Sequence, residues 1–206
     1  GGIRLGKSKF HCWRRRYGGH GMMDMQQAIA QSCDIYFYDL ARRIGVDRIG
    51  AMARRFGLGE ALDIELVGER EGLVPSKDWK LAVTGVPWQL GETLITGIGQ
   101  AYLLATPLQL AVMTARLANG GIAVRPKLSR HLKPQDDAEG AGEDADDDRT
   151  SQNDGNNIRT TDEGAPPIGV SAANLQIITD AMSEVVNGRR GTARKYKLDK
   201  ELGMKM

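Results

Sequence analysis

Ser32 and Asp34 stand two residues apart in the stretch Ser32-Cys33-Asp34, and they are the residues whose types and spacing could do chemistry. They come directly before a helical pattern of apolar residues. In one interpretation Ser32 or Asp34 caps that helix by accepting a hydrogen bond from a backbone N–H two or three residues on. In the other, the turn presents a hydroxyl and a carboxylate to a cleft, where both could meet a substrate or a catalytic lysine. The local pattern alone favours capping.

Most of the elements that would position this motif are expected to be helices. Apolar residues at helical spacing predict helices over residues 24–29, 35–45 and 46–57, the last two of which end at a glycine. A later helix is predicted from about Ser171 to Asn187. Residues 59–97 are punctuated by Gly, Pro and Trp, and we expect them to form long ordered loops.

The clearest local pattern in the chain is a capping signal at Thr106. Thr106 stands where an N-cap belongs, Pro107 at the first helical position and Gln109 at the place of a capping-box partner. We assign Gln109 to capping alone. Gly120 supplies a left-handed stop, so the sequence predicts a helix between these signals.

The remaining segments are predicted to be two stretches of strand and one disordered insertion. Residues 3–13 alternate in the manner of short strands, and residues 122–132 resemble an exposed strand in which Pro126 favours an edge position. Residues 135–167 have hardly any apolar side chains, and the part from 136 to 148 holds eight of the 26 acidic residues and no Lys or Arg. So few apolar groups cannot offset the entropy lost on ordering, and we expect this acidic insertion to be disordered.

The rest of the chain is basic, with 28 Lys and Arg against 18 acidic residues outside the window 136–148. Such a surface could attract nucleic acid, anionic lipid headgroups or an acidic polymer. No helical pattern shows a Lys/Arg stripe interleaved with stacking aromatic residues, so an ordinary solvated face is favoured and nucleic acid is not an expected partner. The longest apolar passage, from Ile98 to Met113, is interrupted by polar residues and is not predicted to span a membrane.

Cys12 and Cys33 are the only cysteines of the chain. Two thiols can form one disulfide or none, and they are too few for a disulfide scaffold or for a zinc site of their own. His11, beside Cys12, lacks a second Cys/His pair at the spacing of metal ligands. We therefore expect no metal.

Three stretches occur in one order and at one spacing: SCDIYFYDLARRIGVDRI from Ser32, GETLITGIGQAYLLATPLQLAVMTARLANGG from Gly91, and MSEVVNGRRGTA from Met182. Together they resemble the transpeptidase domain of class B penicillin-binding proteins, and among these the members that act in cell elongation. The resemblance covers nearly all of residues 1–134 and 168–206. Only the acidic insertion falls outside it.

The resemblance implies an α+β fold of the serine β-lactamase and D,D-transpeptidase type. In this fold helices cover an antiparallel sheet, an all-helical lobe lies beside it, and the active site lies between them. Residues 1–134 would supply mainly the helical lobe with the Ser-x-Asp motif, and the sheet would be incomplete. Residues 168–206 would supply a back helix and the lead-in to a strand that this chain lacks.

The family uses three motifs: Ser-x-x-Lys, which supplies nucleophile and base, then Ser-x-Asn, then Lys-Thr/Ser-Gly. Only the second is present here, with Asp34 in place of Asn. An ionised carboxylate cannot donate a hydrogen bond, so Asp34 is expected to hold a lysine ammonium rather than a substrate carbonyl. Thr192 to Lys195 has the spacing of the first motif, but the resemblance places it near a helix end, outside the active site. The family's order puts the nucleophile before Gly1 and the third motif after Met206, so this chain alone is expected to be inactive.

The activity that the resemblance implies is a peptidoglycan D,D-transpeptidase that cross-links stem peptides through a serine acyl-enzyme. Ser32 would relay a proton between the motif lysines and on to the leaving D-alanine, and Asp34 would order that network. In the stretch TGIGQ from Thr96, two interpretations of equal weight remain: Thr96, Ile98, Gly99 and Gln100 line the substrate cleft, or Gly97 and Gly99 are there for tight helix packing. No metal or organic cofactor is implied.

The implied partners are stem peptides ending in D-Ala-D-Ala, the β-lactams that imitate them, and the glycan polymerase and scaffold proteins of the elongation complex. The implied location is the bacterial inner membrane, with the catalytic domain in the periplasm and an anchor outside this chain. An alternative from another class is a non-catalytic helical interaction module. In that case the Ser-x-Asp motif is only a cap and the basic surface binds a partner.

Overall fold

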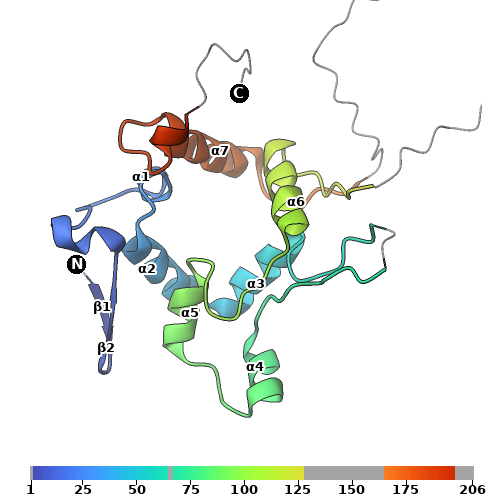
Figure 1. The fold of residues 1–206 in the computed structure, drawn as a ribbon, viewed down its shortest axis with the longest axis horizontal. Helices are drawn as coiled ribbons and strands as arrows, with labels where there is room; N and C mark the ends of the chain where they lie inside the picture. The colour runs from blue at the N-terminus through green and yellow to red at the C-terminus, as the bar shows by residue number, and fades with distance from the viewer. Residues whose placement is uncertain (1, 65–66, 128–164, 198–206) are drawn as a thin grey trace, which may run out of the picture.

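The computed structural model describes residues 2–64, 67–127 and 165–197, and helices make up most of their regular structure (Figure 1). Along these residues the elements are β1 (Gly2–Leu5), β2 (Ser8–His11), the 3-10 helix η1 (Trp13–Tyr17), α1 (Met25–Ala30), α2 (Asp34–Ile44), α3 (Val46–Arg55), α4 (Lys77–Thr84), α5 (Leu90–Thr96), α6 (Pro107–Ala118), α7 (Ala172–Asn187) and the 3-10 helix η2 (Arg194–Tyr196). Within these ranges no helix has the length and apolar character needed to cross a membrane. A small antiparallel sheet among many helices confirms the expected α+β class.

β1 and β2 form an antiparallel hairpin, which confirms the strands predicted near the start of the chain. Gly2 lies opposite His11, and Ile3 lies opposite Phe10. The ring of Phe10 meets the ring of Tyr38 in α2 edge to face, with the ring centroids 5.7 Å apart. This contact fixes the hairpin, and with it the segment that follows β2, against α2.

The helices predicted on either side of the Ser-x-Asp motif are confirmed. Asp24 caps α1 by accepting a hydrogen bond from the N–H of Gln27 over 2.8 Å. A single residue, Gly45, separates α2 from α3, and its φ of 85° lies in the region that favours glycine. The last predicted helix is confirmed as α7, which begins after its cap Ser171 and lies against α1 (Figure 1). The motif therefore lies between helices whose ends are fixed by their own sequence.

The prediction of long loops over residues 59–97 is wrong, because α4 and α5 lie in this stretch. Ser76 caps α4, its hydroxyl accepting a hydrogen bond from the N–H of Trp79. Gln89 and Glu92 form a capping box at the start of α5. Because the two helices have only eight and seven residues, their apolar faces are too short to give a clear period, and the capping residues are the signal that marks them.

A buried ion pair joins α4 to α5. Lys80 is only 4% exposed and places Nζ 2.6 Å from Glu92 Oε1. The same ammonium donates to the carbonyl of Pro87 over 3.1 Å. The hydroxyl of Tyr102 donates to Glu92 Oε1 over 3.1 Å, and its ring packs edge-on against Trp79. Lys80 and Glu92 thus neutralise each other, as the burial of a charge requires. These side-chain bonds hold the two short helices together.

The capping box predicted at the start of α6 is confirmed, but the assignment of Gln109 to capping alone is wrong. The N–H of Gln109 donates to Thr106 Oγ1 and the N–H of Thr106 donates to Gln109 Oε1, both over 3.1 Å. The side-chain amide of Gln109 also donates to the carbonyls of Glu60 and Glu71, each over 2.8 Å. Local sequence cannot indicate these contacts, because the two carbonyls are 49 and 38 residues away along the chain.

The exposed strand predicted over residues 122–132 is not formed in its described part. Ile122 makes only an isolated bridge, with Pro167, and Pro126 has no N–H with which to extend a ladder. The rest of this segment lies outside the described residues. So does the acidic insertion predicted over 135–167, apart from its last three residues.

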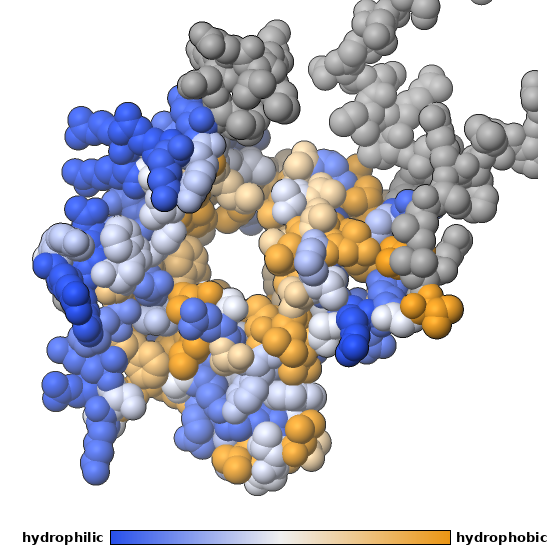
Figure 2. All heavy atoms as spheres, in the orientation of Figure 1, coloured by the Kyte–Doolittle hydropathy of each residue, from blue (hydrophilic) through white to orange (hydrophobic). Residues whose placement is uncertain are grey.

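Hydrophilic and hydrophobic side chains gather on different parts of the molecule. Figure 2 shows hydrophilic residues over the hairpin, η1 and the C-terminal end of α7, and many hydrophobic residues over α4, α5 and α6. The start of α2 lies next to η1 (Figure 1). The Ser-x-Asp motif at the head of α2 is therefore close to the hydrophilic part of the surface.

Candidate active site

Ser32 occupies the turn between α1 and α2, and its backbone lies in the left-handed region with a φ of 52°. This region is unfavourable for a residue other than glycine, so the surrounding contacts must hold Ser32 there. One of them closes the end of α1, where the N–H of Cys33 donates to the carbonyl of Ala28 over 2.9 Å. The turn that results presents the exposed side chain of Ser32 to solvent.

The capping interpretation of the motif is wrong for α2. The N-cap residue is Cys33, and α2 has no side-chain capping hydrogen bond. The hydroxyl of Ser32 instead contacts Thr192, and the carboxylate of Asp34 accepts a hydrogen bond from Trp13. Both polar groups are thus directed to other parts of the fold rather than to the start of their own helix.

Trp13, at the start of η1, holds both sides of the motif. Its backbone N–H donates to Asp34 Oδ2 over 2.9 Å. Its indole Nε1 donates to the carbonyl of Ser32 over 2.9 Å and to that of Gln31 over 3.2 Å. No local pattern indicates the role of Trp13, because it is 19 residues from Ser32 and the two become neighbours only when the hairpin packs on α2.

Thr192 lies beside Ser32, in contrast to its predicted place outside the active site. The hydroxyl oxygens of the two residues are 3.1 Å apart, and the N–H of Thr192 donates to the carbonyl of Ala30 over 3.1 Å. Lys195, which gave the segment its Ser-x-x-Lys spacing, places Nζ over the ring of Tyr196, 4.8 Å from its centroid. The segment after α7 therefore contributes a hydroxyl to the surroundings of Ser32.

Gln100, one of the residues predicted to line the substrate cleft, borders a pocket together with Asp34. The pocket has a volume of 470 Å³, and Trp13, Tyr38 and Ile98 also line it. An amide and a carboxylate at the edge of an open pocket offer the kind of polar groups that fix the orientation of a bound ligand. The structure thus brings together two residues that are far apart in the sequence and were both predicted for the site.

Thr96 and Gly99, which were also predicted for the cleft, are placed differently. Gly99 is exposed and adopts a φ of 75° in the turn after α5. Thr96 is 4% exposed, and its hydroxyl donates to the carbonyl of Glu92 within α5 over 2.8 Å. Thr96 does not line the pocket that Gln100 and Asp34 share.

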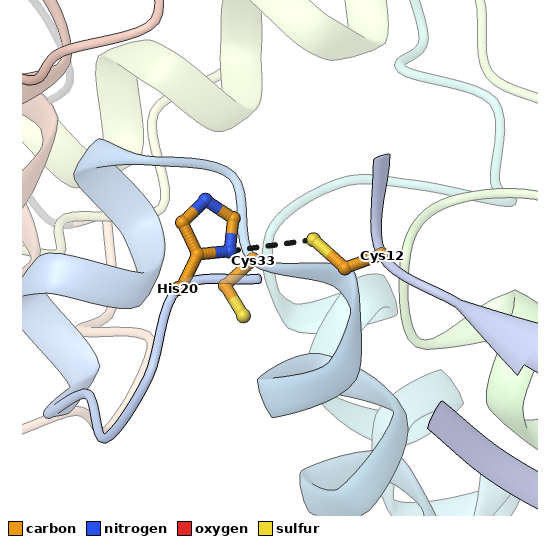
Figure 3. Close-up of side chains that lie close together, drawn as sticks. All are labelled: Cys12, His20 and Cys33. Atoms are coloured by element: carbon orange, nitrogen blue, oxygen red, sulfur yellow. Dashed lines mark hydrogen bonds between the residues drawn. The ribbon is translucent and has the colours of Figure 1, made fainter. Parts of the chain in front are cut away.

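Cys12, His20 and Cys33 converge beside the motif (Figure 3). Both Sγ atoms and a ring nitrogen of His20 lie within 4.8 Å of one another, and Cys12 Sγ is 3.4 Å from His20 Nδ1. Both cysteines are buried and free of a disulfide. His20 Nε2 is buried and has no hydrogen-bond partner among the residues that the structure describes. The three side chains share the wall of a pocket of 540 Å³.

Burial shifts the pKa values of His20 and Cys33. Burial lowers the pKa of His20, with the nearby charge of Arg14 acting in the same direction and Asp34 opposing it. Burial also raises the pKa of the Cys33 thiol, and Cys12 adds to the rise. At neutral pH His20 is therefore a neutral imidazole and Cys33 a thiol.

Two cysteines and a histidine are the ligands that Zn²⁺ prefers. Three protein ligands suit an open zinc site, in which water or a substrate atom completes the tetrahedron. The cluster can hold such an ion, which would displace the thiol protons on binding. The prediction of no metal from the sequence was based on His11, the histidine next to Cys12. His20 was missed because it is eight residues from Cys12 in a glycine-rich loop, a spacing that marks no common metal motif.

The arrangement of the site and the helices around it belongs to a known class of protein. Residues 1–205 match the protein-family model described as the penicillin-binding protein transpeptidase domain. The chain therefore belongs to the penicillin-binding protein transpeptidase family.

Within that family the chain is similar to proteins of the PBP2 group, which confirms the resemblance to the elongation members. It is 43% identical over 122 residues to the peptidoglycan D,D-transpeptidase MrdA of Acinetobacter baumannii, a match that covers 59% of this chain and 18% of the relative. A crystal structure of Pseudomonas aeruginosa PBP2 in complex with WCK 5153 matches 95% of this chain and 40% of that chain, with 39% identity and a TM-score of 0.75. The complex between PBP2 and MreC from Helicobacter pylori matches 94% of this chain and 31% of that chain, with 30% identity and a TM-score of 0.74. The chain thus spans only a part of the length of these proteins.

Proposed function

We propose that the protein to which this chain belongs is a peptidoglycan D,D-transpeptidase that cross-links stem peptides during cell elongation. The observation that carries the proposal is the state of Ser32, whose exposed hydroxyl is held in a left-handed turn beside a carboxylate that Trp13 fixes. Membership of the transpeptidase family and similarity to a relative named for this activity support it. Stem peptides ending in D-Ala-D-Ala are the proposed substrates, and β-lactams are the inhibitors that imitate them.

The proposed chemistry is acyl transfer through a serine ester. The nucleophile and its lysine belong to a Ser-x-x-Lys motif, which we place in the part of the domain that precedes this chain. The serine attacks the carbonyl between the two D-alanines as the lysine takes its proton, and backbone N–H groups stabilise the oxyanion. The peptide C–N bond then breaks and D-alanine leaves with a proton. The amine of a neighbouring stem attacks the ester and restores the serine.

Ser32 and Asp34 are proposed to manage the protons and charges of these steps. A hydroxyl can accept a proton from a lysine while passing its own to the leaving amine. Asp34 accepts the N–H of Trp13 at Oδ2, and its negative charge and remaining lone pairs suit a lysine ammonium. Gln100 is proposed to contact the substrate, since it borders the same pocket as Asp34. Gly99, which is exposed in the adjoining turn, is proposed to contact the substrate with it. Thr96 would contribute through the packing of α5, because its hydroxyl is bonded inside that helix.

The proposed partners are scaffold proteins and a glycan polymerase of the elongation complex. The H. pylori PBP2 that this chain resembles was solved with MreC, which supports a scaffold partner. We place the catalytic domain in the periplasm, next to its peptidoglycan substrate, on a protein anchored in the inner membrane. The alternative of a non-catalytic helical module has no supporting observation, since it needs the Ser-x-Asp motif to be a cap and α2 has no side-chain cap bond.

The proposal is tested by replacing Ser32 in the full-length enzyme. Ser32→Ala is expected to slow acylation by a fluorescent penicillin by about 100-fold, because a positioned proton-transfer group contributes at least this factor. The matched control is Ser183→Ala on α7, an exposed serine whose hydroxyl accepts a hydrogen bond from Asn187, and it should be labelled at the wild-type rate. Labelling of a folded Ser32→Ala enzyme at the wild-type rate would contradict the proposal.

A further inference from the structure

The segment of residues 188–193, here called the α7 hook, turns back from the end of α7 and brings a second hydroxyl to Ser32. Thr192 Oγ1 lies 3.1 Å from Ser32 Oγ. On the basis of the function proposed above, we infer that Thr192 is a positioning residue of the transpeptidase. Its hydroxyl selects the side-chain orientation in which Ser32 relays protons.

The backbone fixes the α7 hook on both sides of Thr192. The N–H of Thr192 donates to the carbonyl of Ala30 over 3.1 Å, and the N–H of Ala193 donates to the carbonyl of Val185 over 3.0 Å. A Cβ on Gly191 would collide with the carbonyl oxygen of Val185, so this close return of the chain requires a glycine. Since α7 lies against α1, the hook places Thr192 at the end of α1, where the Ser32 turn begins.

These anchors matter because both hydroxyls are exposed. A hydrogen bond between two exposed hydroxyls on mobile side chains would compete poorly with hydrogen bonds to water. Here the main chain of Thr192 is bonded to Ala30, and that of Ser32 is bonded to the indole of Trp13. Thr192 is also β-branched, which restricts its χ1. The χ1 rotation of Ser32 remains free, and the bond to Thr192 favours one of its rotamers.

A hydroxyl partner suits a proton relay because it can both donate and accept. When Ser32 passes its proton to the leaving amine, Thr192 can donate to the serine oxygen. When Ser32 accepts a proton, Thr192 can turn its lone pair toward it. Ser32 therefore keeps one orientation in both half-reactions, and a valine of the same shape could not do this.

The test uses the full-length enzyme and the rate of acylation by a fluorescent penicillin. Thr192→Val is expected to slow acylation about tenfold, the effect of losing one hydrogen bond. Thr192→Ser, which keeps the hydroxyl, is expected to restore the rate to within about twofold. Thr179→Val on α7 is the matched control, because the Thr179 hydroxyl donates only within its helix, to the carbonyl of Gln176, and it should behave as wild type.

A double-mutant cycle separates positioning from a general effect on structure. Because Thr192 acts through Ser32, Thr192→Val is expected to cause no further loss in the Ser32→Ala background. An equal loss in both backgrounds, or a wild-type rate for Thr192→Val, would overturn the inference and leave the proposed function intact. A wild-type rate for Ser32→Ala would instead overturn the proposed function. If Thr192→Val does not fold, Thr192→Ala takes its place, and failure of both to fold while Thr192→Ser folds would also overturn the inference.

Discussion

The backbone N–H of Trp13 donates to the carboxylate of Asp34 over 2.9 Å, although the two residues are 21 positions apart in the sequence. The indole of Trp13 also holds the carbonyl of Ser32. The catalytic geometry proposed for Ser32 and Asp34 thus depends on a residue outside the family motifs. Replacing that residue therefore tests whether the hairpin side of the site serves catalysis or only stability.

Trp13→Phe keeps the backbone N–H and removes the indole donor. We expect acylation of the full-length enzyme to fall about tenfold, because the carbonyl of Ser32 loses the bond that holds its turn. Trp88→Phe is the matched control, since it removes an indole bond of 2.8 Å to Thr93 Oγ1, a group that is not part of the motif. It should lower the midpoint of thermal unfolding and leave the acylation rate unchanged. A wild-type acylation rate for Trp13→Phe would show that the Trp13 indole has no role in catalysis.

Zn²⁺ is expected to raise the midpoint of thermal unfolding of the metal-free enzyme, because an ion that binds only the folded state stabilises it. Mg²⁺ should not, since it prefers oxygen ligands. His20→Ala should abolish the shift by removing a ligand of the cluster with Cys12 and Cys33. His11→Ala, which changes the neighbour of Cys12 outside the cluster, should keep it. The same shift in His20→Ala as in the wild type would rule out a site at these residues.

The ion pair between Lys80 and Glu92 is expected to be a major determinant of stability. The Lys80 side chain is 5% exposed and that of Glu92 20%, so Glu92→Gln should cost about 3–5 kcal/mol by leaving the Lys80 ammonium buried without its counter-charge. Lys80→Met should cost less, because Glu92 is partly exposed and keeps its bonds to the Gln89 N–H and the Tyr102 hydroxyl. The double variant should cost less than the sum of the two. Lys77→Met breaks an exposed pair with Asp47 and should cost less than about 1 kcal/mol. Denaturant unfolding measures all four, and additive costs would contradict a direct pairing.

The same pair predicts how stability depends on pH. Burial raises the pKa of Glu92, but the hydrogen bonds from Lys80, from the Gln89 N–H and from Tyr102 outweigh it and hold the pKa below its usual value of 4.5. A carboxyl with a lower pKa in the folded than in the unfolded state stabilises the protein above the unfolded pKa, and this contribution is lost as the pH falls through the folded pKa. Thermal melts should therefore show a smaller acid loss for Glu92→Gln than for the wild type below pH 4.5. Parallel curves would contradict this assignment.

Gln109 is expected to stabilise the fold beyond its role in the capping box. Gln109→Leu keeps the backbone N–H that Thr106 caps, but it removes the acceptor for the N–H of Thr106 and the donors to the carbonyls of Glu60 and Glu71. It should cost about 2–4 kcal/mol. Thr106→Ala removes only the cap and should cost about 1 kcal/mol. Denaturant unfolding compares the two. If they cost the same, the contacts that tie the α3–α4 connection to α6 contribute nothing to stability.

Patterns within a few residues of one another predicted the helices that carry the site. The caps at Asp24, Thr106 and Ser171 act on backbone N–H groups of their own first turn, so the sequence contains the whole interaction. The Ser-x-Asp motif is also a local pattern. Together with the order of the other family stretches along the chain, it sufficed to predict the family. The short helices α4 and α5 were missed because their apolar periods are brief, although Ser76 and the pair Gln89 and Glu92 mark their starts.

The sequence by itself thus determined the helices on either side of the Ser32 and Asp34 motif, the motif itself and the family of the chain. Only the tertiary structure decided which groups surround that motif: the indole of Trp13, the hydroxyl of Thr192 and the cluster of Cys12, His20 and Cys33. Ser32 and Thr192 are 160 residues apart and meet because α7 packs on α1 and the hook returns to it. Such contacts depend on how whole helices pack, and helix packing is set by the sum of many weak interactions that no local pattern contains.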